Sequence, residues 1–166
     1  MIIKIISVGK LKQTGFVNLV NDYLKRINYY LKRINYYLKC QEIVVNDEPE
    51  PTQISTKLLE QIKDKEANRI LKNINQNDFV IALIIEGKII SSEMLAENLQ
   101  NWLNASYPNI CFVIGGSNGL HEKIYERANY HLSLSKMTFA HGLAKVMVCE
   151  QIYRALSILN NGKYHK

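Results

Sequence analysis

Five short apolar runs alternate with five longer segments of helical periodicity along this chain of 166 residues. Two of the runs, Ile81-Ala-Leu-Ile-Ile85 and Ile110-Cys-Phe-Val-Ile114, are continuously apolar, with no polar residue at alternate positions. Strands of this kind are covered on both faces, as in a parallel sheet with helices on either side. Because parallel neighbours need a crossover connection, the alternation predicts an α/β fold with a mostly parallel sheet flanked by helices.

The pattern also predicts where each element lies. We expect strands at residues 2–8, 40–45, 78–85, 109–114 and 130–134. We expect helices at residues 14–37, 53–73, 91–104, 119–128 and 142–160. The clearest loop is the acidic turn 46–51, Asn-Asp-Glu-Pro-Glu-Pro, which is too short to link two domains. We therefore expect one domain over residues 1–166, a length that can bury a sizeable core.

The composition of the chain is that of a globular protein and argues against several other classes of protein. With 47% hydrophobic and 22% charged residues, the chain reads as an ordinary globular protein. No apolar run reaches the roughly 18 residues of a membrane span, and the apolar start is too short for a signal peptide. Cys40, Cys111 and Cys149 lack CxxC spacing, so we expect buried free thiols and a reducing, cytoplasmic location. The four histidines lie far apart, so we expect no metal site.

The net charge of +6 is concentrated at the start of the chain. Residues 1–40 contain eight Lys or Arg and one acid, Asp22, together with several tyrosines. A basic surface with aromatic side chains suits a nucleic-acid phosphate backbone. A solvated helix face explains the same pattern, and charge alone does not separate the two interpretations.

A perfect heptad repeat lies in the first predicted helix. Tyr-Leu-Lys-Arg-Ile-Asn-Tyr occupies 23–29 and recurs at 30–36. Seven residues are close to two helical turns, so the second copy is rotated by only about 20° around the axis. It would lengthen the helix by roughly 10 Å and add Lys32 and Arg33. We interpret the repeat as a duplicated heptad, because two copies are too few for a coiled coil.

Two polar loops follow apolar strands in the last third of the chain. Gly115-Gly-Ser-Asn-Gly119 follows the fourth strand, and Leu134-Ser-Lys-Met-Thr-Phe139 follows the fifth. Ligands of open α/β sheets bind beyond the carboxyl ends of strands, and glycine lets the backbone approach a ligand closely. The turn is neither a GxGxxG motif nor a P-loop, which argues against a dinucleotide-dependent oxidoreductase. A plain strand-to-helix turn is the alternative.

These loops, with Glu150-Gln-Ile-Tyr-Arg-Ala155 and the terminal Tyr164-His-Lys166, resemble the RlmH family of SPOUT-class methyltransferases over nearly the whole chain. The resemblance implies a SPOUT-type α/β knot with a C-terminal trefoil knot. It also implies a homodimer that uses S-adenosylmethionine to methylate N3 of a pseudouridine in the 23S rRNA of the large ribosomal subunit. A non-catalytic RNA-binding or ribosome-binding module of the same fold is the alternative.

The resemblance assigns roles to individual residues. The implied cofactor-binding set is Leu83, Gly115, Gly116, Leu134, Ser135, Lys136, Met137, Thr138 and Phe139. The candidate catalytic residues, which would accept the imide proton or stabilise the imide anion, are His141, Arg154, Tyr164 and His165. Each has a structural alternative: a satisfied histidine, an ion pair of Arg154 with Glu150, and a frayed tail.

The last predicted helix, residues 142–160, carries an apolar stripe wider than one sheet face requires. Such a stripe suits either a central core helix or a helix shared with a second subunit. Ala140 and Lys145 stand where relatives commonly have proline and arginine. Arginine and lysine differ at sites that bind phosphate in a bidentate manner, so Lys145 is a position of interest.

Overall fold

The computed structural model describes residues 1–35, 37–53 and 55–166. A single five-stranded sheet has the order β2-β1-β4-β3-β5, with every neighbouring pair parallel. The strands are β1 (Ile2–Val8), β2 (Lys39–Val45), β3 (Phe79–Ile89), β4 (Asn109–Ile114) and β5 (Tyr130–Ser133). The helices are α1 (Thr14–Ile34), α2 (Thr56–Leu71), α3 (Ser92–Asn104), α4 (Glu122–Arg127) and α5 (His141–Leu159). This confirms the predicted α/β fold.

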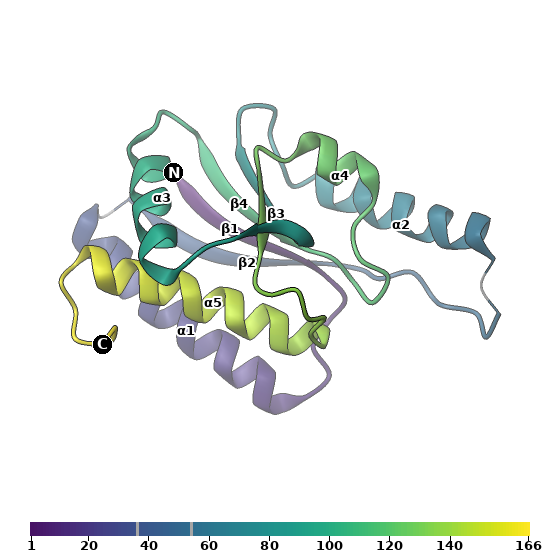
Figure 1. Cartoon of the computed structure of the whole chain (residues 1–166), viewed down its shortest axis with the longest axis horizontal. Coiled ribbons are helices and arrows are strands. Elements are labelled where there is room, and N and C mark those ends of the chain that lie inside the picture. The colour runs from purple at the N-terminus through teal and green to yellow at the C-terminus, as the bar shows by residue number, and fades with distance from the viewer. Residues whose placement is uncertain (36, 54) are drawn as a thin grey trace.

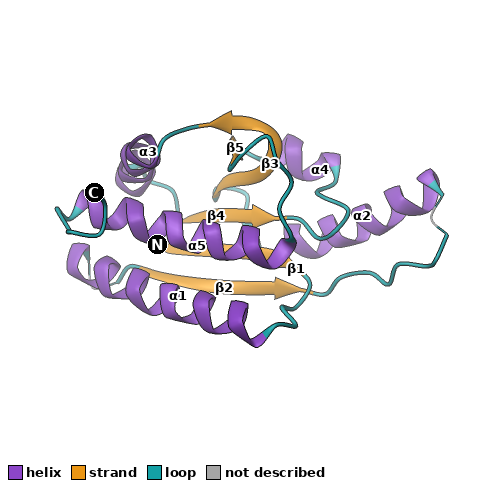
Figure 2. Cartoon of the chain, turned by 60° about the horizontal axis from the view of Figure 1, so that its bottom comes forward, coloured by secondary structure: helices purple, strands orange, loops and turns teal. Residues whose placement is uncertain are grey.

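Helices cover both faces of the sheet (Figures 1 and 2). Helices α1, α3 and α5 lie on one face, with Phe112 of β4 in the core beneath them. Helices α2 and α4 lie on the other face, over Cys111 and Val113 of the same strand. Successive residues of β4 therefore enter two different cores, which is why the strand is continuously apolar.

Strand β3 runs further than expected, to Ile89 and not to residue 85. Its pairing with β5 shifts register between Leu83 and Lys88, so the strand is irregular around its predicted end. A side chain on Gly87 would lie 2.7 Å from the carbonyl carbon of Leu132. The strand continues because glycine lets the two backbones come this close.

The two copies of the heptad keep the same phase along most of their length. The rings of Tyr23 and Tyr30 both contact Tyr153 of α5, with centroids 5.9 and 5.6 Å from its ring. The copies differ at their isoleucines, because Ile27 is fully buried whereas Ile34 is 46% exposed. Helix α1 ends at this second isoleucine, short of the predicted residue 37, and residue 36 lies outside the described part of the chain.

Asn28, in the first copy, holds the start of the edge strand β2. Its Nδ2 donates to the Cys40 carbonyl at 2.9 Å, and the Cys40 backbone N–H donates to its Oδ1 at 2.8 Å. The helix then continues beyond this clamp to Ile34 before the chain returns to β2. The second heptad is thus an extension of α1 past the point where helix and strand are already joined.

A buried polar network joins the amino ends of the central strands. Asp78 accepts hydrogen bonds from Lys4 Nζ at 3.0 Å, Asn109 Nδ2 at 2.7 Å and the Asn75 backbone N–H at 3.0 Å. Burial opposes ionisation of Asp78, but these donors outweigh it and hold the pKa of the carboxyl below its usual value. The network fixes the end of the sheet opposite to the polar loops.

All three cysteines are free and buried, as expected. Burial raises the pKa of the Cys111 and Cys149 thiols to about 12, so both stay protonated and unreactive at neutral pH. Within the described ranges, none of the helices combines the length and apolar character needed to span a bilayer.

Candidate active site

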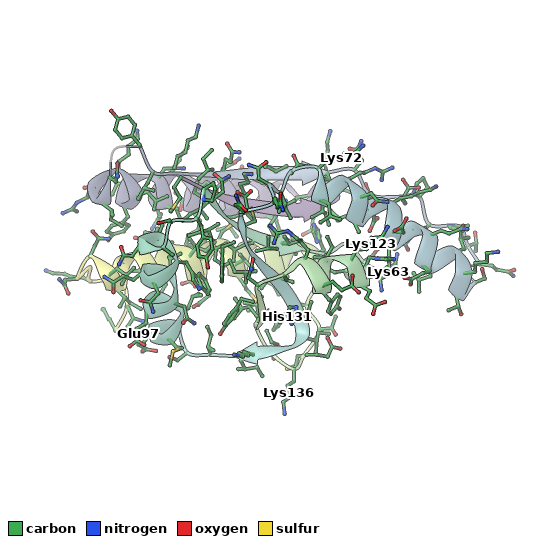
Figure 3. The ribbon with its side chains drawn as sticks, turned by 90° about the horizontal axis from the view of Figure 1, so that it is seen from above. Lys63, Lys72, Glu97, Lys123, His131 and Lys136 are labelled. Atoms are coloured by element: carbon green, nitrogen blue, oxygen red, sulfur yellow. The ribbon has the colours of Figure 1, made fainter. Side chains whose placement is uncertain are left out.

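A pocket of about 370 Å³ opens at the carboxyl ends of β3, β4 and β5. Residues of the predicted cofactor-binding set that line it are Leu83, Gly115, Gly116, Leu134, Ser135, Met137, Thr138 and Phe139. The side chain of Lys136 is not part of the lining; it is exposed and projects away from the molecule (Figure 3). The sequence reasoning missed other lining residues, namely Ile84, Ile85, Ile114, Ser117, Asn118, Gly119, Leu132, Ser133 and Ala144.

The glycine turn needs its glycines for its own closure. A Cβ on Gly115 would lie 2.7 Å from the carbonyl carbon of Gly119, and a Cβ on Gly116 would lie 3.1 Å from the Val8 side chain. Gly119 has a φ of +76°, in the region that favours glycine. The absence of a Cβ at Gly115 therefore serves the closure of the turn itself, and close approach of its backbone to a ligand stays a prediction.

The acidic turn 46–51 fastens the glycine turn from outside. The Glu50 carboxylate accepts hydrogen bonds from Asn118 Nδ2 at 2.6 Å and from the Ser117 hydroxyl. Both donors also line the pocket. The sequence offered no signal for this contact, since the partners lie 67 and 68 residues apart.

His141, the first residue of α5, contacts the glycine turn. Its Nδ1 lies 3.1 Å from the Gly115 carbonyl oxygen, which can only accept, so Nδ1 carries the hydrogen. Burial lowers the pKa of this imidazole and the Lys145 charge lowers it further, whereas the Gly115 and Gly9 carbonyls and Asp47 act in the opposite direction. The neutral ring has its Nε2 buried and without a hydrogen-bond partner among the described residues. His141 therefore holds the glycine turn through one nitrogen, and its other nitrogen is a buried acceptor that has no partner among the described residues.

Lys145 lies one helical turn after His141 and does not face solvent. Its side chain is 1% exposed and forms an ion pair with Glu42 of β2. The pair joins the last helix to the edge strand across the core. At this position the lysine serves an internal carboxylate and not an external phosphate.

The other three candidate catalytic residues meet at the far end of α5. Arg154 donates from Nε and Nη2 to Glu150 Oε1, at 3.0 and 2.6 Å. The Tyr164 hydroxyl donates to the same oxygen at 3.0 Å, and the Arg154 guanidinium lies 4.6 Å from its ring centroid. His165 Nε2 lies 2.8 Å from Glu93 Oε1 of α3. Arg154 therefore pairs with Glu150, and side chains of α1, α3 and α5 hold the tail in place.

This cluster determines the protonation of Tyr164. Burial, the neighbouring Tyr23 hydroxyl and the Glu150 carboxylate all raise the pKa of Tyr164 well above its usual value. Its hydroxyl therefore keeps its proton at neutral pH and acts as a hydrogen-bond donor. The ion pair of Arg154 with Glu150 was one of the alternatives that the sequence offered, whereas the hydrogen bond of Tyr164 to the same carboxylate was not predicted.

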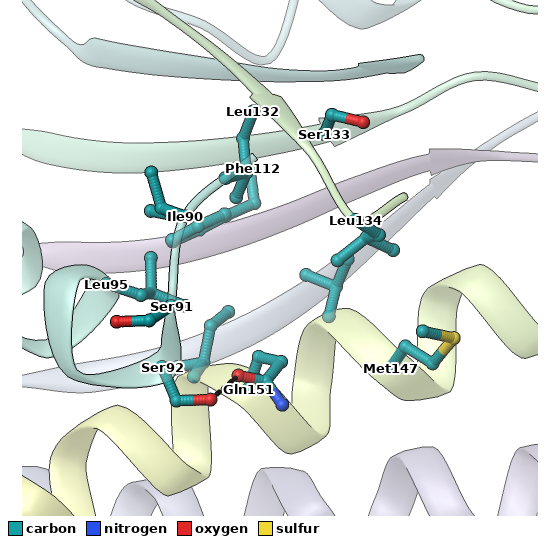
Figure 4. A pocket seen from close by; sticks show the side chains of 12 residues that line it. Ile90, Ser91, Ser92, Leu95, Phe112, Leu132, Ser133, Leu134, Met147 and Gln151 are labelled. Atoms are coloured by element: carbon teal, nitrogen blue, oxygen red, sulfur yellow. Dashed lines mark hydrogen bonds between the residues drawn. The ribbon is translucent and has the colours of Figure 1, made fainter. Parts of the chain in front are cut away.

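The two groups of candidate catalytic residues are far apart within one chain. His141 and Arg154 are thirteen positions apart on the same helix, which corresponds to about 20 Å. A second pocket of about 280 Å³ lies along α5 between them, and Figure 4 shows its walls. It shares Leu132, Ser133 and Leu134 with the first pocket. On its α3 side, Ser92 Oγ donates to Gln151 Oε1 at 2.8 Å (Figure 4).

Comparison with solved structures places this fold among known ones. The chain is similar to a probable methylase family protein from Haemophilus influenzae Rd KW20, with a TM-score of 0.53 and 14% identity over 96% of this chain. It spans 66% of that solved chain. A second solved structure, described as a hypothetical protein, gives a TM-score of 0.51 at 11% identity, covering 95% of this chain and 68% of the other. At such identities the likeness shows the fold alone.

Sequence comparison is more specific. A family model described as a predicted SPOUT methyltransferase matches residues 1–165. A protein of Ureaplasma urealyticum serovar 10 is 96% identical over the full length of both chains, and one of Ureaplasma parvum serovar 3 is 78% identical over the same extent. Both carry the name ribosomal RNA large subunit methyltransferase H. The resemblance found in the sequence is confirmed, and this chain belongs to the SPOUT methyltransferase family.

Proposed function

We propose that this chain transfers a methyl group from S-adenosylmethionine to N3 of a pseudouridine in the 23S rRNA of the large ribosomal subunit. One observation carries the proposal: both polar loops meet at the carboxyl ends of three strands and enclose a pocket of about 370 Å³. That volume lies within the range of small-molecule sites, and the position is where open α/β sheets bind ligands. The names of the relatives point to the same substrate, large-subunit rRNA.

The pocket lining fits this cofactor. Leu83, Ile114 and Leu132 supply apolar walls for a flat base, and the backbone of the 134–139 loop supplies donors and acceptors. The loop is pre-shaped, because Ser135 Oγ accepts from the Met137 backbone N–H at 3.0 Å. When bound, the cofactor supplies a methyl group already activated on sulfonium. The protein then has to exclude water, align the acceptor and deal with one proton.

A homodimer completes the site in this proposal. Apolar side chains remain exposed on β3, α3, the 134–139 loop and the start of α5: Ile85, Ile89, Met94, Met137 and Leu143. In this proposal these side chains lie in the interface between the two copies. A second copy that runs antiparallel along α5 would place its tail cluster at this pocket, which bridges the separation of about 20 Å within one chain. The C-terminal trefoil knot stays a prediction.

The tail cluster suits the chemistry of the acceptor. The imide nitrogen becomes anionic when its proton leaves, and Arg154 together with the protonated Tyr164 would stabilise that charge as donors. His141 Nε2 and His165 are the groups that could receive the proton. Because the substrate is ribosomal, the proposed location is the cytoplasm.

Mass spectrometry of rRNA provides the direct test. Large ribosomal subunits from cells lacking this protein are incubated with the purified protein and methyl-labelled S-adenosylmethionine. We expect one labelled methylpseudouridine in 23S rRNA. No methyl transfer, combined with no heat of S-adenosylmethionine binding in calorimetry, would instead support a non-catalytic RNA-binding module.

A further inference from the structure

The outward face of α1 carries a strongly basic surface that the proposed active site does not use. The buried residues of the helix are Val20, Ile27 and Leu31. On the opposite side, five exposed residues form what we call the basic stripe: Lys25, Arg26, Tyr29, Lys32 and Arg33. The heptad spacing brings Lys32 and Arg33 of the second copy to the same face of the helix as Lys25 and Arg26 of the first.

The charges of the stripe are largely uncompensated. Arg26 pairs with Asp22 at 2.8 Å, and Asp22 is the one acidic residue of the helix. Within the described ranges, Lys25, Lys32 and Arg33 form no ion pair with a carboxylate. Uncompensated like charges on one face repel each other and attract an anionic partner. A second copy of the same face is disfavoured as the occupant, because it would oppose positive charge to positive charge.

An exposed aromatic ring lies within the stripe. Tyr29 is 62% exposed, and the Arg33 guanidinium lies 5.8 Å from its ring centroid. Basic side chains interleaved with accessible aromatic rings are the means by which proteins hold RNA without reading its sequence: the cations bind phosphates and the rings stack on unpaired bases.

The second heptad lengthens the stripe without being needed to connect α1 with β2. Asn28 already joins the helix to Cys40 through two hydrogen bonds. The chain nevertheless continues through Lys32 and Arg33 before it returns. The extension adds the buried Leu31 to the core, but it also leaves Ile34 46% exposed and adds two exposed cations, so it lengthens the charged surface.

We propose that the basic stripe of α1 binds the phosphate backbone of RNA, and that the duplicated heptad extends this binding surface by two helical turns. The inference rests on the proposed function, because it names the surface by which the ribosomal substrate is held outside the methyl-transfer pocket. The stripe contributes to affinity for RNA and not to the chemical step.

The test compares two double variants that remove the same net charge. Lys32→Gln with Arg33→Gln removes the extension of the stripe. Lys57→Gln with Lys72→Gln removes two exposed lysines, one in the first turn of α2 and one directly after its end, on the other face of the sheet (Lys72 is labelled in Figure 3). Affinity for purified large ribosomal subunits is measured by filter binding at several KCl concentrations, without S-adenosylmethionine.

Each lost phosphate contact lowers the slope of log affinity against log salt by about 0.7–0.9, so the stripe variant should lose about 1.4–1.8. The same two contacts correspond to a loss of roughly 40-fold in affinity at 0.1 M salt. The α2 variant should stay close to the wild type. Lys32→Arg with Arg33→Lys keeps both charges and should keep the slope.

Equal losses in the stripe and α2 variants would overturn the proposal, because net charge alone would then explain binding. An unchanged slope in the stripe variant would overturn it as well. Both outcomes are independent of catalysis. If the wild type binds subunits through the stripe but transfers no methyl group, the proposed activity fails and the stripe stands.

Discussion

His141 Nδ1 lies 3.1 Å from the carbonyl oxygen of Gly115, and this contact ties the start of α5 to the turn after β4. The two residues are 26 positions apart, and both line the pocket at the carboxyl ends of the strands. The hydrogen bond determines which imidazole nitrogen carries the proton. It also makes the shape of the pocket depend on the state of one histidine.

Stability should fall when the pH drops below the range in which His141 is neutral. Burial lowers its folded pKa below the unfolded value of about 6.5, so its contribution is complete above about 6.5 and is lost as the pH falls toward the folded pKa. One proton limits the slope to about 1.4 kcal/mol per pH unit. Urea unfolding of wild type and His141→Gln between pH 5 and 7.5 checks this. Parallel curves for the two proteins would contradict it.

Filling the pocket should abolish cofactor binding. Ala144 lies in the first turns of α5 and lines the pocket, so Ala144→Phe places a ring in the space assigned to S-adenosylmethionine. Ala144 is only partly buried, so the helix should accommodate phenylalanine there and the thermal midpoint should change little. Calorimetry should show no binding for this variant and normal binding for Asn18→Phe, an exposed position of α1. Unchanged affinity in a folded Ala144→Phe protein would remove the assignment.

Removing one partner of the Glu42–Lys145 ion pair should destabilise the protein far more than removing both partners. Glu42→Gln leaves the ammonium of a side chain that is 1% exposed without its counter-charge, at a cost of about 3 kcal/mol. The double variant Glu42→Leu with Lys145→Met removes both charges and should recover most of that loss. Denaturant unfolding of the wild type and the two variants measures this difference. A double variant no more stable than Glu42→Gln would contradict the prediction.

The two ends of α5 should act in different subunits. Ala144→Phe blocks the pocket, and deletion of residues 164–166 removes the tail, so each homodimer should be inactive. In a mixed dimer, one of the two sites receives both an open pocket and an intact tail. Mixing the variants should therefore restore activity to as much as about a quarter of the wild type for random subunit exchange. Light scattering must show a dimer, and a monomer at micromolar concentration would exclude this arrangement.

Removing residues 30–36 should leave a folded protein that binds S-adenosylmethionine normally. Asn28 and Cys40, which form the clamp, lie on either side of the deleted segment and are both kept, and the helical phase changes by only about 20°. Stability should fall, because Leu31 is fully buried in the wild type. Circular dichroism and calorimetry report fold and cofactor affinity separately. Failure to fold would show that the second copy is part of the core.

The order and type of every element could be predicted from the sequence, because apolar periodicity is a local property. Continuous apolar runs such as Ile110–Ile114 require cover on both faces, and that requirement alone leads to helices on either side of a parallel sheet. The two polar loops follow two strands of a parallel sheet, so both could be placed at the edge where the strands have their carboxyl ends. Residues 134–139 and the glycine turn were therefore expected near each other before any contact was known.

Tertiary structure decided the contacts between residues that are distant in the sequence. Glu50 meets Asn118 across 68 positions, and Glu42 meets the buried Lys145 across the core. Neither pairing could be predicted from a periodic sequence pattern. A single charged residue looks the same in the sequence whether its side chain contacts water or a carboxylate. The orientation of His141 toward Gly115 was likewise undetermined, since a hydrogen bond of 3.1 Å depends on how strand β4 and helix α5 are placed relative to each other. Local patterns thus determined the elements of this protein, and packing in three dimensions decided which side chains meet in its site.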